Sequence, residues 1–315
     1  MKVFLIVLCF LFLLFAVLFI IFMVVFFNVF KRRKPVTDDG IKYYMDTHDL
    51  EKYEDEIKNG INLFREIEKE EVYIKSYDGY KLKGYYVKNK KNINKTIILA
   101  HGYHSAPFFD FSIGFQEYRK MGFDLLFIEE RCHEYSQGKF TTFGIKERFD
   151  IRDWARYVSK NYPENDILLA GVSMGSSAVL FSLNLDLPSK VVAAICDCGF
   201  SDAFEELAWT LNHQPKWYHR FVINILDLYM RLFEGVSFKD TNAFIALKDN
   251  KIPVLIAHSE TDEVVPFYMG KEMYEVITTD KAFVDVKVAR HAQSFLRDRD
   301  NYKKVLSDFL SKVLK

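Results

Sequence analysis

The sequence has no excess of charge of either sign and little cysteine. It contains 43 lysines and arginines against 43 aspartates and glutamates in 315 residues. Proteins that bind nucleic acid through phosphates carry a surplus of basic side chains, so we expect no nucleic-acid partner. The four cysteines show no spacing typical of a disulfide framework, which fits a reducing compartment. There is also no internal repeat, which argues against a solenoid or an array.

Polar residues are almost absent from the first thirty positions. Residues 3–30 carry no charge, and about 20 apolar residues suffice to cross a bilayer. A cleavable secretory signal has a shorter apolar core followed by a small-residue cleavage site, and this segment has neither. A core helix would show a polar face, which is also missing. We therefore expect residues 1–30 to be a transmembrane anchor.

Basic residues beside the anchor predict its orientation. Lys31, Arg32, Arg33 and Lys34 follow it directly, whereas Lys2 is the one basic side chain before it. The positive-inside rule then places the C-terminal part of the chain, and its globular domain, in the cytoplasm. A signal anchor with a short basic head can also translocate its C-terminal side, so the opposite orientation stays open.

The remaining chain divides by composition. Residues 31–70 are charged with a helical tendency and predict a stalk, and residues 71–315 are enough for one large α/β domain. Period-two alternation around Asp78-Gly79 predicts a β-hairpin. Short apolar runs separated by helical stretches then predict a mostly parallel sheet with helices on both faces. These runs are residues 96–100, 124–128, 167–170, 191–196, 254–258 and 283–288.

Three chemistry-bearing residues follow three of these runs. Ser173 lies in GVSMG directly after residues 167–170, Asp262 follows residues 254–258, and His291 follows the last run. Ligands bind beyond the carboxyl ends of parallel strands, so we expect the three side chains to meet there. A serine hydroxyl becomes a good nucleophile when an imidazole accepts its proton, and an acid orients that imidazole. The order serine, aspartate, histidine predicts a catalytic triad.

The glycines around Ser173 have a steric role. A sharp turn from strand to helix holds a nucleophile in a strained backbone conformation and leaves no room for side chains two positions away. Gly171 and Gly175 occupy those positions. We expect them to form a nucleophile elbow.

With these motifs the chain resembles the α/β-hydrolase superfamily, and more closely a bacterial subgroup of membrane-anchored serine hydrolases. The resemblance covers roughly residues 70–312. It rests on HGYHS (101–105), RCHEYSQG (131–138), FGIKERFD (143–150), GVSMG (171–175), DCGF (197–200), DEVVP (262–266) and ARHA (289–292). It implies an α/β-hydrolase fold with a small helical cap at about residues 203–250.

The resemblance also implies roles for individual residues. Ser173 would be the nucleophile, Asp262 the acid and His291 the base, with an oxyanion hole formed by the backbone N–H groups of Tyr103 and Met174. The chain departs from the subgroup pattern at Glu129, Glu134 and Ser259, which replace an aspartate and two glycines. These departures concern the geometry of loops and leave the triad positions intact.

Alternatives remain for several of these assignments. Asp197 also follows a predicted strand, at a place where some α/β-hydrolases carry the acid. His101, His104 and His133 lie on loops without a metal-ligand spacing, so we expect no metal and no cofactor. Aromatic residues of the cap are candidates for an acyl pocket or for plain packing: Trp209, Trp217, Tyr218, Phe221 and Tyr229. A structural charge network is expected from Arg131, Glu147, Arg148 and Asp150.

The activity that the resemblance implies is hydrolysis of carboxylic esters with small or medium acyl chains through an acyl-enzyme. A peptidase or a thioesterase would use the same groups, and fold alone does not decide the substrate. A binding protein that keeps the fold without turnover is the alternative from another class. The sequence indicates no oligomeric state.

Overall fold

A twisted eight-stranded sheet forms the centre of the computed structural model, which describes residues 1–91 and 93–314. Its strand order is β1-β2-β4-β3-β5-β6-β7-β8. β2 pairs antiparallel with β1 and β4, and all the other pairs are parallel. The strands are β1 (Glu70–Lys75), β2 (Lys81–Val87), β3 (Lys95–Ala100), β4 (Asp124–Ile128), β5 (Asp166–Val172), β6 (Val191–Asp197), β7 (Val254–Ser259) and β8 (Lys281–Val286).

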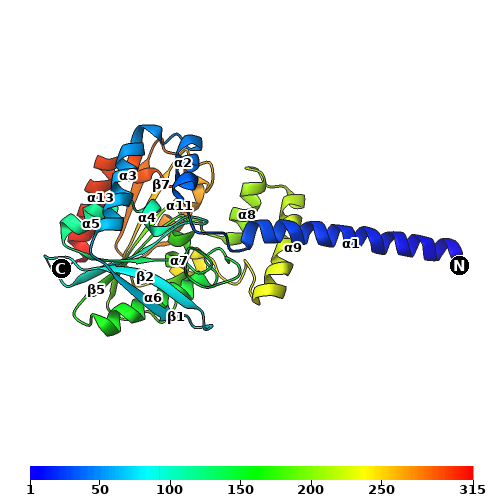
Figure 1. Ribbon diagram of the computed structural model, residues 1–315, viewed down its shortest axis with the longest axis horizontal. Coiled ribbons are helices and arrows are strands. Elements are labelled where there is room, and N and C mark those ends of the chain that lie inside the picture. The colour runs from blue at the N-terminus through cyan, green and yellow to red at the C-terminus, as the bar shows by residue number, and fades with distance from the viewer. Residues whose placement is uncertain (92, 315) are drawn as a thin grey trace.

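Helices cover both faces of the sheet (Figure 1). The helices of the described chain, including those that do not cover the sheet, are α1 (Lys2–Phe30), α2 (Asp38–Thr47), the 3-10 turn η1 (Glu51–Tyr53), α3 (Glu54–Glu66), α4 (Pro107–Asp110), α5 (Phe115–Met121), α6 (Glu147–Asn161), α7 (Met174–Ser182), α8 (Ala203–Leu211), α9 (Trp217–Glu234), α10 (Ala243–Leu247), α11 (Phe267–Val276), α12 (Ser294–Arg297) and α13 (Arg299–Val313). α3, α5 and α13 pack on one face, and α6, α7 and α11 pack on the other.

Strand β5 shows why its sequence is an uninterrupted apolar run. Ile167 and Leu169 belong to the core cluster on one face of the sheet, whereas Leu168 and Ala170 belong to the cluster on the other. Successive side chains of a strand point to opposite faces, so a strand covered on both sides must be apolar at every position. The predicted α/β fold, its mostly parallel sheet and the hairpin at Asp78-Gly79 are confirmed.

Helix α1 leaves the domain as a long arm (Figure 1). In the described part of the chain it is the one helix long and apolar enough to cross a membrane. Its far part is exposed, whereas Phe26 and Phe30 near its C-terminal end are fully buried. Their rings pack against Phe140 and Phe238. The C-terminal end of α1, residues 22–30, which we call the root of the helix, is therefore part of the main core.

Residues 31–70 differ from the expected stalk. Their apolar side chains form a small core of their own through Ile41, Met45, Leu50, Ile57 and Ile61, and this core packs against partly buried Phe109 and Leu296. Charged residues cover its outer side, which explains why the segment reads as polar in sequence. The domain boundary at residue 71 stays a prediction, but the preceding segment is folded onto the domain.

Candidate active site

The turn between β5 and α7 holds Ser173 in a strained conformation. Its φ is 54° and its ψ is −121°, a region that non-glycine residues rarely occupy. A Cβ on Gly171 would lie 2.4 Å from the carbonyl carbon of Gly175, and one on Gly175 would lie 2.3 Å from the carbonyl oxygen of Ala100. Both positions therefore need glycine, because the chain passes too close to itself for any side chain.

His291 connects Ser173 and Asp262. Its Nε2 lies 2.7 Å from the Ser173 hydroxyl oxygen, and its Nδ1 lies 2.8 Å from Asp262 Oδ2. The other oxygen of Asp262 accepts the backbone N–H groups of Val264 and Val265, each at 2.9 Å. With its Nδ1–H donated to Asp262, a neutral His291 offers Nε2 to accept the serine proton.

Charges and burial act in opposite directions on this pair. Burial works against the charged form of both groups, but opposite charges nearby outweigh it. His291 lowers the pKa of Asp262, and Cys198, in its thiolate form, together with Asp262 raises the pKa of His291 well above its ordinary value. Cys198 Sγ lies within 4.8 Å of both. Because burial raises the pKa of the Cys198 thiol to about 11, this sulfur is uncharged near neutral pH. Asp262 is therefore the group that stabilises a protonated His291.

The alternative acid, Asp197, is placed differently. It ends β6, and its backbone carbonyl accepts the N–H of Ser173 at 2.9 Å. Its buried Oδ1 has no hydrogen-bond partner among the described residues. Burial raises the pKa of Asp197 to about 7, as expected for a carboxyl without a close cation. Asp262, and not Asp197, thus accepts the hydrogen bond of His291 Nδ1–H.

The loop after β3 lies beside Ser173. Asp110 organises it by accepting the N–H of Gly102 at 2.6 Å and the hydroxyl of Ser105 at 2.5 Å. The N–H groups of Tyr103 and Met174 donate to no other group in the described residues, and Met174 is the first residue of α7. Free N–H groups at a helix start can stabilise a developing oxyanion.

Two of the three loop histidines, His101 and His133, hold the loops through both ring nitrogens, whereas the buried Nε2 of His104 has no hydrogen-bond partner among the described residues. His101 contacts the carbonyl of Gly102 through Nδ1 and accepts the N–H of Glu130 through Nε2. His133 contacts the carbonyl of Arg131 through Nδ1 and accepts the N–H of His104 through Nε2. Both ring nitrogens of each are occupied by backbone groups, so neither ring has a nitrogen free for a metal ion.

A cavity of about 280 Å³ lies next to Ser173, His291 and Tyr103. Much of its wall comes from the segment that follows α1, namely Pro35, Val36, Thr37, Gly40, Ile41 and Tyr44. A second cavity, of about 100 Å³, shares Tyr44, Phe109 and His291 with it and continues toward Asp197 and Tyr302. This wall was not expected from the sequence, because nothing local in residues 35–44 indicates a distant serine.

The aromatic residues of the expected cap lie elsewhere. Trp217, Tyr218 and Phe221 are exposed on α9, and Tyr229 packs against Phe19 of α1. Neither cavity includes them or Trp209. Residues 203–250 do form the helical insertion between β6 and β7, but the pocket wall expected from their aromatic side chains is supplied by the N-terminal segment.

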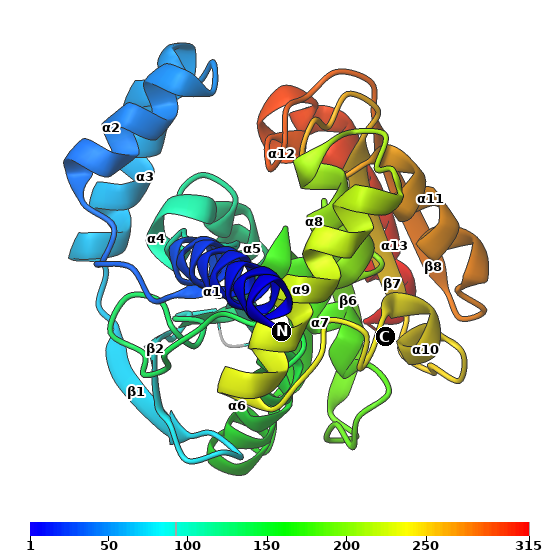
Figure 2. The same ribbon diagram turned by 90° about the vertical axis from the view of Figure 1, so that its right-hand side faces the viewer.

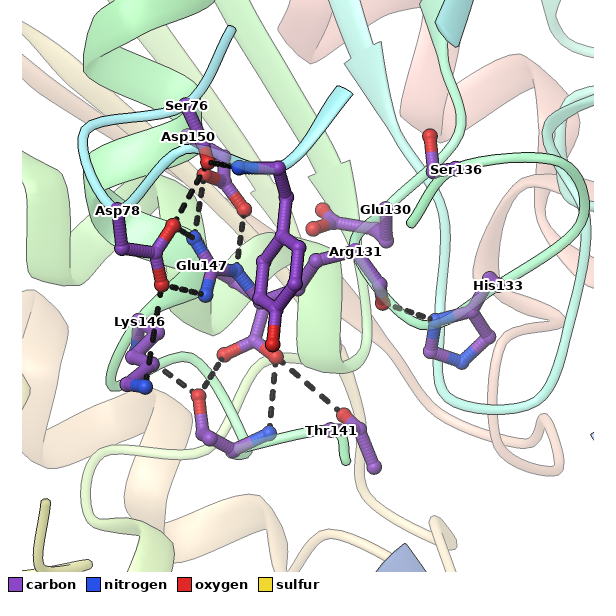
Figure 3. A network of polar contacts seen from close by, with 12 residues as sticks. Ser76, Asp78, Glu130, Arg131, His133, Ser136, Thr141, Lys146, Glu147 and Asp150 are labelled. Atoms are coloured by element: carbon purple, nitrogen blue, oxygen red, sulfur yellow. Dashed lines mark hydrogen bonds and ion pairs between the residues drawn. The ribbon is translucent and has the colours of Figure 1, made fainter. Parts of the chain in front are cut away.

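A buried polar network supports the loops after β4 (Figure 3). The guanidinium of Arg131 donates to Asp150 at 2.5 and 2.7 Å and to Asp78 at 2.9 Å. Glu147 accepts the N–H groups of Thr142 and Gly144, each at 2.9 Å. Arg148, which we expected in this network, makes no ion pair in the described residues. Its side chain stacks on Phe149 instead.

Two departures from the subgroup pattern have structural roles. Glu134 has a φ of 44°, the left-handed conformation for which glycine is the usual residue. Its carboxylate accepts the N–H of Val36 at 2.7 Å, which attaches the N-terminal segment to this loop. The hydroxyl of Ser259 accepts the N–H of Ala289 at 2.9 Å, close to His291 in the chain.

Taken together, the strand order, the elbow after β5 and the loops after β7 and β8 define an α/β-hydrolase fold. Solved structures with this fold include an esterase of Pyrococcus furiosus, Pf2001, with a TM-score of 0.63 and 22% identity over 79% of this chain and 94% of that chain. An acylaminoacyl peptidase of Pyrococcus horikoshii has a TM-score of 0.59 and 20% identity over 81% of this chain and 43% of that chain.

Sequence comparison points to an uncharacterized relative. The protein YqkD of Bacillus subtilis is 26% identical over 254 residues, which are 79% of this chain and 82% of YqkD. No family model matches the chain. The similarity to an esterase and a peptidase supports an α/β hydrolase and leaves its substrate open.

Proposed function

We propose that the protein is a membrane-anchored serine hydrolase that cleaves carboxylic esters. The observation that carries the proposal is the position of His291, 2.7 Å from the Ser173 hydroxyl and 2.8 Å from Asp262. The strained elbow, the raised pKa of His291 and the adjoining cavity add to it. No cofactor is needed for this chemistry.

In the proposed reaction, Ser173 Oγ attacks the ester carbonyl while His291 Nε2 takes its proton. The N–H groups of Tyr103 and Met174 stabilise the tetrahedral oxyanion, and His291 returns the proton to the leaving alcohol. The acyl group is then bound to Ser173 as an ester. A water molecule, deprotonated by His291, releases the acid and regenerates the serine.

An ester substrate is favoured over a peptide by the cavity. Val36, Ile41, Phe109 and Val172 give it apolar walls, as an acyl chain requires. The esterase of Pyrococcus furiosus and the peptidase of Pyrococcus horikoshii match this chain over similar lengths, so the preference for an ester rests on the cavity. Helix α1 would cross the membrane, and the basic residues 31–34 favour a cytoplasmic domain.

The test is active-site labelling of the full chain in detergent micelles with a fluorophosphonate probe. The full chain is required, because residues 26 and 30 are core residues and residues 35–44 line the cavity. We expect wild type and the control Ser182→Ala to be labelled and to hydrolyse p-nitrophenyl esters, and Ser173→Ala to do neither. Labelling of Ser173→Ala would identify another nucleophile. Folded wild type without labelling or turnover would favour a binding protein.

A further inference from the structure

Helix α9 exposes a row of four large apolar side chains along one face, with exposed Asn224 between the second and the third. Trp217, Phe221, Leu228 and Leu232 are 77, 57, 52 and 63% exposed. Their spacings of four, seven and four residues place them on one helical face. The opposite side of α9 is buried in the core through Ile223, Leu226 and Met230. A water-soluble surface rarely shows such a face, so this row requires an apolar environment.

The C-terminal half of the row lies beside helix α1, which Tyr229 and Phe233 of α9 contact. Figure 2, which looks toward the domain from the side where α1 projects, shows α9 lying across the root of α1. The hydroxyl of Tyr229 donates to the carbonyl of Phe19 at 2.6 Å, and its ring lies 5.2 Å from that of Phe19. Leu228 precedes Tyr229 and points to the exposed side. The apolar surface therefore continues from α1 onto α9.

The length of α1 indicates the depth at which α9 would lie relative to a bilayer that α1 crosses. α1 packs against the core cluster from Phe22 onward. Residues 3–21 precede this packing, apart from the contact of Phe19 with Tyr229, and they would measure about 28 Å, close to the ~30 Å of a hydrocarbon core. One membrane surface would then lie near Phe19 to Phe22. This is the level at which Tyr229 attaches α9 to α1.

We propose that the exposed face of α9 lies in the interfacial layer of the bilayer that α1 crosses, as an in-plane amphipathic helix; this rests on the membrane anchoring proposed above. Its composition fits that position, because Trp217 and Tyr218 are residue types enriched at lipid headgroups and Phe221, Leu228 and Leu232 can reach the acyl chains. Lys31, Arg33, Lys34 and Lys216 are exposed and suit anionic headgroups.

This docking would place the active site close to the membrane surface. The phenol of Tyr103 donates to the carbonyl of Val29, in the last turn of α1, so the loop beside Ser173 lies at the root of the helix. Val29 is seven residues beyond Phe22, or about 10 Å along the axis. The substrates that fit are esters dissolved in the bilayer, whose acyl chains would travel a short distance to the cavity.

The first test measures the depth of Trp217 in the full chain. The protein is reconstituted in vesicles of phosphatidylcholine and phosphatidylglycerol, some with brominated acyl chains that quench tryptophan on contact. The chain has three tryptophans, and Trp154 is fully buried. We expect brominated lipid to quench a component of the fluorescence that Trp217→Phe lacks. This readout needs no catalysis, so it is independent of the proposed hydrolase activity.

Two other results would overturn the proposal. If the Trp217 component is quenched by aqueous acrylamide and untouched by brominated lipid, α9 faces water. If neither reagent quenches it, another protein surface, such as a second copy of the chain, covers α9. Wild type that docks but hydrolyses nothing would contradict the proposed function and leave the docking intact.

The second test compares two substrates. Phe221→Glu with Leu228→Glu removes two apolar anchors, which we expect to lower hydrolysis of a vesicle-borne lipid ester about tenfold or more. Hydrolysis of dissolved p-nitrophenyl acetate should be unchanged, because neither residue lines the cavities. Tyr73→Glu, an exposed aromatic position on β1, is the matched control and should affect neither substrate. Equal loss on both substrates in the α9 variant would contradict a docking role.

Discussion

Tyr103 donates its phenolic hydrogen bond to the backbone carbonyl of Val29 in the last turn of α1. Its ring lies 5.0 Å from Phe143, which in turn lies 5.6 Å from Phe30. The loop beside Ser173 is thus held by the root of the apolar helix as well as by Asp110. The helix that we expect to anchor the protein also positions a part of the candidate active site.

Tyr103→Phe tests this link. The substitution keeps the ring and removes the hydrogen bond, so the backbone N–H proposed for the oxyanion hole loses one restraint. We expect kcat to fall about tenfold with little change in KM, which corresponds to about 1.4 kcal/mol, the scale of one hydrogen bond. Tyr229→Phe is the matched control, because its phenol also donates to a carbonyl of α1, whereas Tyr229 lines neither of the two cavities beside His291. Equal kcat for the two variants would mean that the link does not affect catalysis.

The two candidate acids can be separated by Asp262→Asn and Asp197→Asn. The first removes the carboxylate that holds His291 Nδ1–H, and we expect kcat to fall about 10⁴-fold, as for a triad with the wrong histidine tautomer. Asp197 makes no hydrogen bond to His291, and the raised pKa of its buried carboxyl means that asparagine resembles its neutral form. We expect Asp197→Asn to retain activity within a few-fold. The measurement is steady-state turnover of a p-nitrophenyl ester, and the reverse ranking would make Asp197 the acid.

The pH dependence should report the raised pKa of His291. The base must be neutral to accept the serine proton, so kcat/KM should rise with pH, and the midpoint should lie above the ordinary histidine pKa of 6.5. Cys198→Ala should move the midpoint little, because its thiol is uncharged in this range. Asp262→Asn should lower the midpoint, which is measured on the residual activity of this variant. A midpoint that shifts strongly in Cys198→Ala would assign a thiolate to the resting site.

Glu206 should destabilise the fold progressively as the pH rises from about 4.5 to about 8. Its side chain is buried on α8 with Oε2 unpartnered, and burial raises its pKa from 4.5 to about 8. Between these values the folded state binds the proton and the unfolded state has lost it, so the free energy of unfolding falls as pH rises. We expect Glu206→Gln to raise the melting temperature at pH 8 and to flatten this dependence, with an effect of a few kcal/mol at about 1.4 kcal/mol per pKa unit.

The neighbouring Glu205→Gln is the control for this prediction, because Glu205 is partly exposed and pairs with Arg220 at the surface. It should change the melting temperature little at any pH. If the melting temperature of Glu206→Gln depended on pH as that of wild type does, the destabilisation would have to come from another buried carboxylate, such as Glu130.

Arg131 should be essential to stability. Its guanidinium is 1% exposed and pairs with Asp150 and Asp78. Arg131→Leu would leave Asp150 buried without its cation, which costs about 3–5 kcal/mol when a buried pair is broken. Arg156→Leu is the control, since Arg156 pairs with exposed Asp186 and surface pairs contribute about 0–1 kcal/mol. Chemical denaturation of both variants gives the comparison, and similar losses would show that the buried network contributes no more than a surface pair.

The sequence by itself determined the layers of the fold and the order of the central residues. Apolar runs such as residues 167–170 predict strands, because a strand covered on both faces must be apolar throughout. The glycines at 171 and 175 predict the elbow, since the reason for them is local backbone geometry. Ser173, Asp262 and His291 could be named because each directly follows a recognisable strand, and the structure brings them together.

Only the tertiary structure shows which distant segments of the chain contact one another. Residues 35–44 read as part of a charged stalk, yet they wall the cavity beside Ser173. The aromatic residues expected to line that cavity from α9 are instead exposed or packed on α1, and Arg148 stays outside the buried network. Periodicity and turn chemistry act over a few neighbouring residues, whereas the neighbours of a side chain across the molecule depend on how helices of different length and face pack together.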